Sequence, residues 1–298
     1  MGRAPAGVML FVLVIVGCSG DDDGDRLGLA AGGREWPTTV APSTTPACVS
    51  GDVTCVDETL GEMRRRLDLL ASSCDHHAVF ALTYLHITAG YREMNTDPGA
   101  FEDVVFMSHL DSLFGQFYFA AFDAYSSGDI ESVPPAWRIA FDQSAAGEIS
   151  GIGDALLGIS AHINRDLPFV LAQLGIVDPS GRTRRDDFDR VNTVFGGALL
   201  AVLKEGAQRF DPALAQPKIG GQPLDAANAL ALVRQWRDAA FHNAERLSAT
   251  VTPEARRAVV AEIEDNAAVM ARSLQLATAL SPSESSAARD DYCESRLN

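Results

Sequence analysis

The segment Ala161-His162-Ile163-Asn164-Arg165-Asp166-Leu167-Pro168 lies within an apolar pattern of helical spacing that runs from Ile152 to Leu174. His162 and Asp166 are four residues apart, so a helix places both side chains on one face. Pro168 has no backbone N–H to donate to the carbonyl of Asn164, and a proline in this position kinks a helix. The segment therefore predicts a helix that is kinked near Pro168 and carries a histidine and a carboxylate beside the kink.

Outward from this segment, the pattern is helical from about residue 57 onward. Apolar residues recur three and four apart, and no stretch alternates with the period of a strand. We therefore predict an all-α fold, a single bundle of about seven or eight helices over residues 57–280, followed by a C-terminal tail over 281–298. The expected helices are Glu58–Ser72, Asp75–Met94, Phe101–Tyr125, Pro135–Ala145, Ile152–Leu174, Asp186–Arg209, Asp225–Ser248 and Pro253–Leu280.

The N-terminus has the features of an export signal. Arg3 precedes a short apolar run from Val8 to Val16, whereas a membrane-spanning helix needs about 20 apolar residues. A basic start and a short apolar core are typical of a secretory signal peptide, which we assign to residues 1–17. We therefore expect an extracytoplasmic protein.

The end of this signal, Ile15-Val16-Gly17-Cys18, resembles the lipobox of bacterial lipoproteins. The resemblance implies cleavage before Cys18 and attachment of lipid to its sulfur, so that the membrane becomes a partner through the N-terminal lipid. An ordinary signal peptide, or a chance Gly-Cys pair, is the alternative. Residues 18–56 are rich in Asp, Gly, Thr and Pro, and we expect them to form a disordered tether.

Four cysteines remain once Cys18 is set aside, an even number that suits an oxidising compartment. They allow three disulfide pairings, of which we favour Cys48 with Cys55 and Cys74 with Cys293. No Cys-x-x-Cys pair occurs, which argues against a zinc-cysteine cluster. The chain also carries a formal net charge of −16, and we expect no nucleic-acid partner because phosphate binding requires a basic face.

Two interpretations of His162 and Asp166 compete. In the first, they are ligands of a divalent metal such as zinc in an envelope hydrolase, with His242 and Glu245 as a second, weaker ligand pair. In the second, Asp166 and His162 belong to a buried polar cluster that fixes the helix register or binds a small molecule. We favour the second, because such a cluster can be satisfied by its own hydrogen bonds.

The order of motifs resembles a family of uncharacterised helical proteins common in actinobacteria, over about residues 75–280. The resemblance implies that His162, Asn164, Asp166 and Pro168 form a signature, with Arg237 and Asn243 as partners from another helix, and it carries no known activity. The buried polar cluster of the second interpretation is therefore expected to comprise His162, Asn164, Asp166 and Arg237. The motifs are Asp75-x-x-Ala78-Val79-Phe80, Leu110-Asp111-x-x-Phe114, Pro135-Ala136-Trp137, the block from Ala161 to Pro168, Arg190-Val191-Asn192 and Trp236-Arg237-x-x-Ala240-Phe241-x-Asn243-Ala244.

A looser similarity links the chain to the helical fold of zinc-dependent phospholipase C and certain secreted zinc nucleases. That similarity implies a metal-bound water that attacks a phosphodiester or lipid substrate. Those enzymes use further histidines as metal ligands, together with a free N-terminal amine. A lipidated Cys18 cannot supply that amine. The signature motifs of serine hydrolases, nucleotide-binding loops and zincins are absent from the sequence.

Overall fold

The computed structural model describes residues 35–280 and 286–297. The predicted signal peptide, Cys18, the tether as far as residue 34 and residues 281–285 of the tail lie outside this range. Within it the fold is all-α apart from one short antiparallel ribbon, in which β1 (Lys218–Ile219) pairs with β2 (Gln222–Pro223). The all-α prediction is therefore confirmed, and no helix of the described residues has the length and apolarity needed to cross a membrane.

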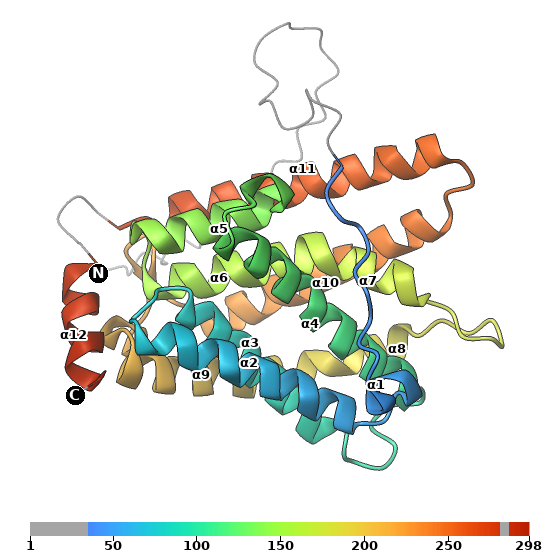
Figure 1. Ribbon diagram of the computed structural model, residues 1–298, viewed down its shortest axis with the longest axis horizontal. Helices are drawn as coiled ribbons and strands as arrows, with labels where there is room; N and C mark the ends of the chain where they lie inside the picture. The colour runs from blue at the N-terminus through green and yellow to red at the C-terminus, as the bar shows by residue number, and fades with distance from the viewer. Residues whose placement is uncertain (1–34, 281–285, 298) are drawn as a thin grey trace, which may run out of the picture. The chain divides into compact units, whose positions relative to one another are not determined.

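The long helices follow the predicted periodicity closely (Figure 1). They are α2 (Thr54–Ser72), α3 (Ala78–Met94), α4 (Val104–Ser126), α5 (Pro135–Ala146), α6 (Gly151–Ala161), α7 (Leu167–Leu174), α9 (Phe195–Arg209), α10 (Ala226–Ser248) and α11 (Pro253–Thr278). Three further helices complete the set: α1 (Pro46–Ser50), α8 (Arg185–Arg190) and α12 (Ala287–Leu297). The described residues thus contain more helices than the seven or eight expected, since one predicted helix is divided and α1 and α12 lie in the predicted tether and tail.

One predicted helix is divided in the structure. The expected helix over residues 186–209 consists of α8, a 3₁₀ turn at Val191–Thr193 and α9. At this break the guanidinium of Arg237 donates to the carbonyl oxygen of Phe188 over 2.6 Å and to Oδ1 of Asn192 over 2.9 Å. A side chain from α10 therefore supplies hydrogen bonds where the α-helical ladder is interrupted, and the sequence pattern alone could not show this.

Pro168 does not end the helix that contains it. Residues His162–Asp166 form a single π-helical turn between α6 and α7, and the N–H of Leu167 donates to the carbonyl of His162, five residues back. The kink predicted near Pro168 thus takes the form of a wide turn just before the proline, which lies in the first turn of α7 where its missing N–H is tolerated. Such π-turns occur often at functional sites.

The N-terminal segment corrects the tether prediction. Residues 35–45 are described as an extended segment that lies along the helices (Figure 1). The carbonyl of Pro37 accepts a hydrogen bond from Nη2 of Arg165 over 2.7 Å, and that of Val40 accepts one from Gln173 over 3.0 Å. Amino-acid composition could not predict these contacts, because the accepting groups are backbone carbonyls, which every residue type carries.

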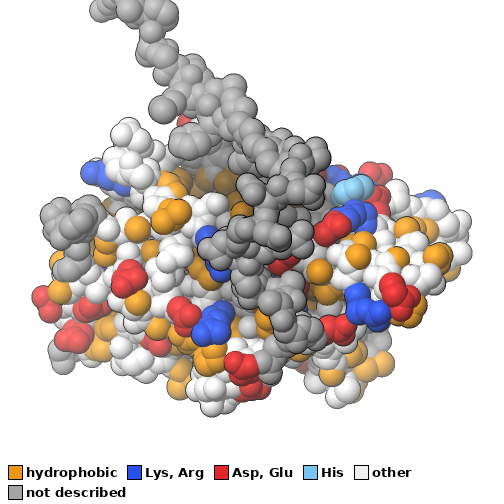
Figure 2. Space-filling model, turned by 90° about the horizontal axis from the view of Figure 1, so that it is seen from above, with side chains coloured by type: hydrophobic (Ala, Val, Ile, Leu, Met, Phe, Trp, Pro, Cys, Tyr) orange, Lys and Arg blue, Asp and Glu red, His pale blue; other side chains and the backbone are white. Residues whose placement is uncertain are grey.

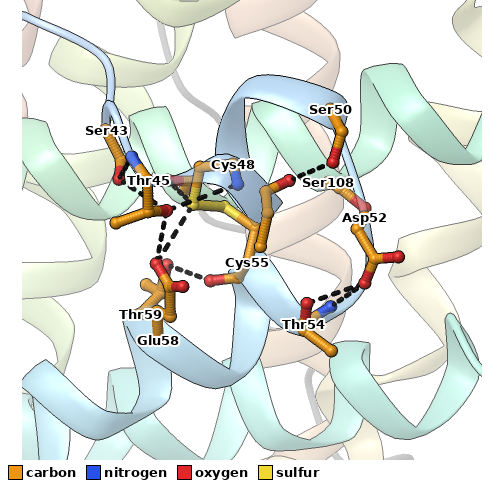
Figure 3. The surroundings of a disulfide bond; sticks show 12 residues. Ser43, Thr45, Cys48, Ser50, Asp52, Thr54, Cys55, Glu58, Thr59 and Ser108 are labelled. Carbon is orange, nitrogen blue, oxygen red and sulfur yellow. Dashed lines mark hydrogen bonds between the residues drawn. A yellow bond between two sulfur atoms is a disulfide. The ribbon is translucent and has the colours of Figure 1, made fainter.

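Both expected disulfides are present, Cys48–Cys55 and Cys74–Cys293. The first joins α1 to α2 and is drawn in Figure 3, where the Thr45 hydroxyl donates to Glu58 over 2.6 Å beside the sulfur atoms. The second attaches α12 to the residues that precede α3. The ordered domain therefore begins before the predicted residue 57, and part of the predicted tail is helical.

Charged side chains are mixed on the face of the domain shown in Figure 2. In the part of that face that is not drawn in grey, acidic and basic groups are interspersed with hydrophobic ones.

A close helix crossing places α6 against α3. Gly158 of α6 lies against the ring of Phe80, so closely that a Cβ at this position would overlap the ring. Gly61 of α2 has open space in the corresponding direction. The glycine at 158 therefore permits the approach that brings α3 and the π-turn together.

We predict that Gly158→Ala lowers the free energy of unfolding by about 1–3 kcal/mol, because the added methyl group overpacks the crossing. The matched substitution Gly61→Ala should raise it by up to about 1 kcal/mol, as expected for glycine to alanine in an exposed helix. Denaturant unfolding measures both values. A Gly158→Ala variant as stable as Gly61→Ala would contradict the described crossing.

Candidate functional site

The Asp166 carboxylate accepts hydrogen bonds from three side chains. Nδ1 of His162 and Nε1 of Trp137 both bond Oδ2, over 2.9 and 2.8 Å, and Nη1 of Arg165 donates to Oδ1 over 3.0 Å. The side chains of His162 and Asp166 are 3% and 0% exposed. This buried carboxylate is therefore well satisfied, and it orients the imidazole of His162.

The hydrogen bond to Asp166 determines which His162 nitrogen is free. Burial lowers the pKa of His162 more than the hydrogen bond to Asp166 raises it, so the imidazole is neutral at pH 7. A neutral imidazole that donates through Nδ1 has a lone pair on Nε2. Nε2 is buried and has no hydrogen-bond partner within residues 35–280 and 286–297, so it is an available acceptor.

Aromatic rings hold the imidazole in place. The ring of Phe114 is parallel to that of His162 at a centroid distance of 3.4 Å, and Tyr84 meets it edge-on at 4.6 Å. Phe114 lies on α4 and Tyr84 on α3, so side chains from two other helices fix the orientation of the histidine on the π-turn. The imidazole is thus pre-organised.

Arg165 extends the network to α11 and to the N-terminal segment. Its Nε and Nη2 donate to Oε1 of Glu264 over 3.0 and 2.8 Å, in addition to the bonds to Asp166 and Pro37. Burial raises the pKa of Glu264, and the charge of Arg165 opposes that shift. One arginine therefore hydrogen-bonds two buried carboxyl groups. The sequence pattern did not mark it as a site residue, although it lies directly before Asp166.

His162 lines a cavity of about 70 Å³ between α3, α4, α6, the π-turn, α9 and α10, which we call the polar cavity. Its walls are mainly aliphatic and aromatic. The lining residues are Phe80, Tyr84, Ile87, Thr88, Tyr91, Met107, Leu110, Asp111, Phe114, Ile159, His162, Ile163, Leu167, Val191, Phe195 and Arg237.

Five of the lining residues carry a buried polar atom without a partner in the described part of the chain. The atoms are the hydroxyl oxygens of Tyr84, Thr88 and Tyr91, Oδ2 of Asp111, and Nε2 of His162. Buried polar groups in proteins are nearly always hydrogen-bonded, and an unsatisfied one costs about 1–3 kcal/mol. Their concentration around one cavity indicates a place where a bound molecule supplies the missing partners.

Asp111 is a hydrogen-bond donor at neutral pH. Burial raises its pKa to about 8, so that the carboxyl group is protonated at pH 7 and carries an O–H. Burial also raises the pKa of the Tyr84 and Tyr91 hydroxyls, which keep their protons. The polar cavity thus combines one acceptor, His162, with several donors.

Arg237 lies in the wall of the same cavity but outside the His162 network. Its guanidinium binds Phe188 and Asn192 and is 3.9 Å from the centroid of the Phe188 ring. Burial lowers its pKa to about 9. The expected cluster of His162, Asn164, Asp166 and Arg237 is therefore only partly formed.

The other predicted residues lie elsewhere. Asn164 donates to the Ser160 hydroxyl over 3.0 Å, and Asn243 accepts from Arg246 over 3.1 Å. His242 and Glu245 are exposed on α10 and 3.2 Å apart. They do not join the buried His162 and Asp166.

The remaining histidines do not converge on a metal site. His76 contacts Asp290, His77 contacts Asp75, and His86 contacts Glu205, with distances between 2.5 and 2.8 Å. Across residues 35–280 and 286–297, no group of three or more His, Cys, Asp or Glu side chains is arranged to hold a metal ion.

Sequence reasoning missed Tyr84, Tyr91, Asp111, Trp137 and Arg165 as site residues. A signal existed for Asp111, which is an acidic residue within a strongly apolar helix, and for Tyr84 and Tyr91, which are seven residues apart and share a helix face. Trp137 belongs to the Pro135-Ala136-Trp137 motif, but its hydrogen-bond partner Asp166 lies 29 residues away. Only the fold shows that the two side chains meet.

A family model described as "Family of unknown function (DUF5995)" matches residues 56–277. The chain belongs to this family. The comparisons with curated proteins and with solved structures give no match. Every residue that lines the polar cavity lies within the matched range, as do Trp137, Asp166 and Glu264. The site is thus part of the DUF5995 domain, whereas α1 and α12 lie outside the match.

We predict that Tyr84→Phe leaves the free energy of unfolding unchanged or raises it by up to about 1 kcal/mol, because the lost hydroxyl has no hydrogen-bond partner among residues 35–280 and 286–297. Trp137→Phe should lower it by about 1–3 kcal/mol, since it removes a donor from buried Asp166. Urea unfolding of both variants tests the contrast. A strong destabilisation by Tyr84→Phe would show that this hydroxyl has a structural partner.

Proposed function

We propose that the protein is a lipid-anchored extracytoplasmic protein whose helical domain binds a small polar molecule in the polar cavity. The observation that carries the proposal is the group of five unpartnered polar atoms around this one cavity. Ligand sites are typically concave and mostly apolar, with a few polar groups that orient the ligand. The polar cavity has this composition.

The available atoms define the chemistry of the ligand. Nε2 of His162 accepts a hydrogen bond, so the ligand offers a hydroxyl or N–H group. The protonated Asp111 and the tyrosine hydroxyls donate, so the ligand also offers acceptor oxygens or nitrogens. A cavity of about 70 Å³ limits the group held there to a few non-hydrogen atoms.

Anchoring through Cys18 and an actinobacterial origin are further parts of this proposal. They are supported by the resemblance of residues 15–18 to a lipobox and by the resemblance of the Ala161–Pro168 block to an actinobacterial family signature. Two disulfides in the domain agree with folding in an oxidising compartment. A tethered domain of this kind would sample small molecules outside the cytoplasm.

Binding is tested with 1,3-butanediol, which carries both donors and acceptors. With ¹⁵N-histidine-labelled protein, the diol should shift the Nε2 resonance of His162 in a saturable manner and leave exposed His242 unchanged. The double variant Tyr84→Phe, Asp111→Asn should weaken the response, because it removes one donor and alters another. Equal responses of His162 and His242, or none at His162 at the highest diol concentration that leaves the protein folded, would contradict the proposal.

The anchor is tested by fractionating cells that express the full chain. Cys18→Ser should move the protein from the membrane fraction to the soluble fraction, because lipidation supplies the membrane affinity. Ser19→Ala is the matched control and should stay with the membrane. A Cys18→Ser variant that remains membrane-bound would refute the anchor and leave ligand binding unaffected.

A further inference from the structure

Arg237 differs from the other deeply buried arginines in the charge of its partners. Arg165 is paired with Asp166 and Glu264, and Arg289 with Asp154 over 2.7 Å. Arg237 is 5% exposed, and both acceptors that the structure gives it, Phe188 O and Asn192 Oδ1, are neutral. Burying a cation without a counter-ion is unfavourable, so this arginine indicates a missing anion.

The carboxylates whose charge acts on Arg237 form ion pairs with another residue. Asp189 and Asp238 both oppose the lowering of the Arg237 pKa, and both are paired with Arg185. Asp111, which shares the polar cavity, is neutral at pH 7 and provides no counter-charge. No carboxylate in the described residues is paired with Arg237, although the chain as a whole is strongly acidic.

A second cavity of about 60 Å³ adjoins the polar cavity, and we call it the apolar cavity. Its walls come from α3, α6, α9, α10 and Leu224, which precedes α10, and Ile87, Ile159 and Phe195 line both cavities. Its one hydroxyl-bearing residue is Thr83, whose hydroxyl donates to the Val79 carbonyl over 2.7 Å. The apolar cavity therefore suits hydrocarbon.

One face of α10 connects the two cavities. Leu230 and Val233 line the apolar cavity, and Arg237, four residues beyond Val233, lines the polar cavity. Residues at this spacing follow one another along a helix face. A molecule bound along this face meets a cation at one end and aliphatic side chains at the other.

We propose that the ligand is an aliphatic hydroxycarboxylate, with its carboxylate on Arg237, its hydroxyl donating to Nε2 of His162 and its chain in the apolar cavity. The inference deepens the proposed function and rests on it. The carboxylate supplies the counter-charge that Arg237 lacks and accepts from the Asp111 and tyrosine O–H groups. The alkyl chain passes Ile87, Ile159 and Phe195, the residues common to both cavities.

Four related compounds separate the three contacts. 3-Hydroxyoctanoate has all of the proposed features, octane-1,3-diol lacks the charge, octanoate lacks the hydroxyl, and 3-hydroxybutanoate lacks the tail. Isothermal titration calorimetry should find 3-hydroxyoctanoate the tightest ligand. We expect the diol to bind about tenfold or more weakly, because it leaves the charge of Arg237 uncompensated, and each lost methylene to reduce affinity roughly fourfold.

Variants assign each contact to its residue. Arg237→Gln should remove the preference for the carboxylate over the diol, whereas Arg234→Gln, an exposed change on the same helix, should preserve it. Ala198→Leu should fill the apolar cavity, so that 3-hydroxyoctanoate binds no better than 3-hydroxybutanoate. Retained diol binding by Arg237→Gln shows that the polar cavity is intact in that variant.

If Arg237→Gln loses the diol as well, Arg237→Lys, which keeps the charge, should restore preference for the carboxylate. Equal affinity of wild-type protein for the diol and the hydroxycarboxylate would overturn the inference while leaving the proposed function standing. Failure of all four compounds and of 1,3-butanediol to bind would overturn both.

Discussion

The structure depends on one buried carboxylate, that of Asp166. Its oxygens accept from Trp137 of α5, His162 of the π-turn and Arg165, and Arg165 continues to Glu264 of α11 and to the carbonyl of Pro37. Segments far apart in the sequence are therefore connected by hydrogen bonds to Asp166 or to its partner Arg165. A buried carboxylate whose partners are removed is strongly destabilising, so these elements are held to one arrangement.

The same carboxylate gives the site its chemistry. Asp166 accepts a hydrogen bond from Nδ1–H of His162, which leaves the Nε2 lone pair available in the polar cavity. Burial keeps the imidazole neutral. Burial also keeps Asp111 protonated. The cavity thus presents hydrogen-bonding groups without fixed negative charge, in a chain whose net charge is −16. The charge that remains in its wall is that of Arg237, which makes an anionic ligand favourable.

Periodicity was enough to predict the helices and the pairing of His162 with Asp166, because both depend on spacing within one segment. The five-residue helix α1 is too short to carry that signal. The partners of Asp166 could not be predicted, since Trp137 reaches it through tertiary packing of α5, and neighbouring residues such as Arg165 do not face each other in a regular α-helix. Arg237 was expected in the His162 cluster but instead caps the break between α8 and α9. Asp111 stands out in the sequence as an acid in an apolar helix, but only the fold shows that its side chain faces a cavity and not solvent.

The central claim is that Asp166 holds His162 as a neutral imidazole with Nε2 unprotonated. The ¹⁵N chemical shifts of both His162 ring nitrogens, measured in the ligand-free protein between pH 5 and 8, test it most directly. The account predicts a protonated Nδ1 and an unprotonated Nε2 at pH 7, with the imidazole gaining its second proton only at a pH below the usual pKa of histidine. A proton on Nε2 at pH 7, as the other tautomer or as imidazolium, would contradict the account.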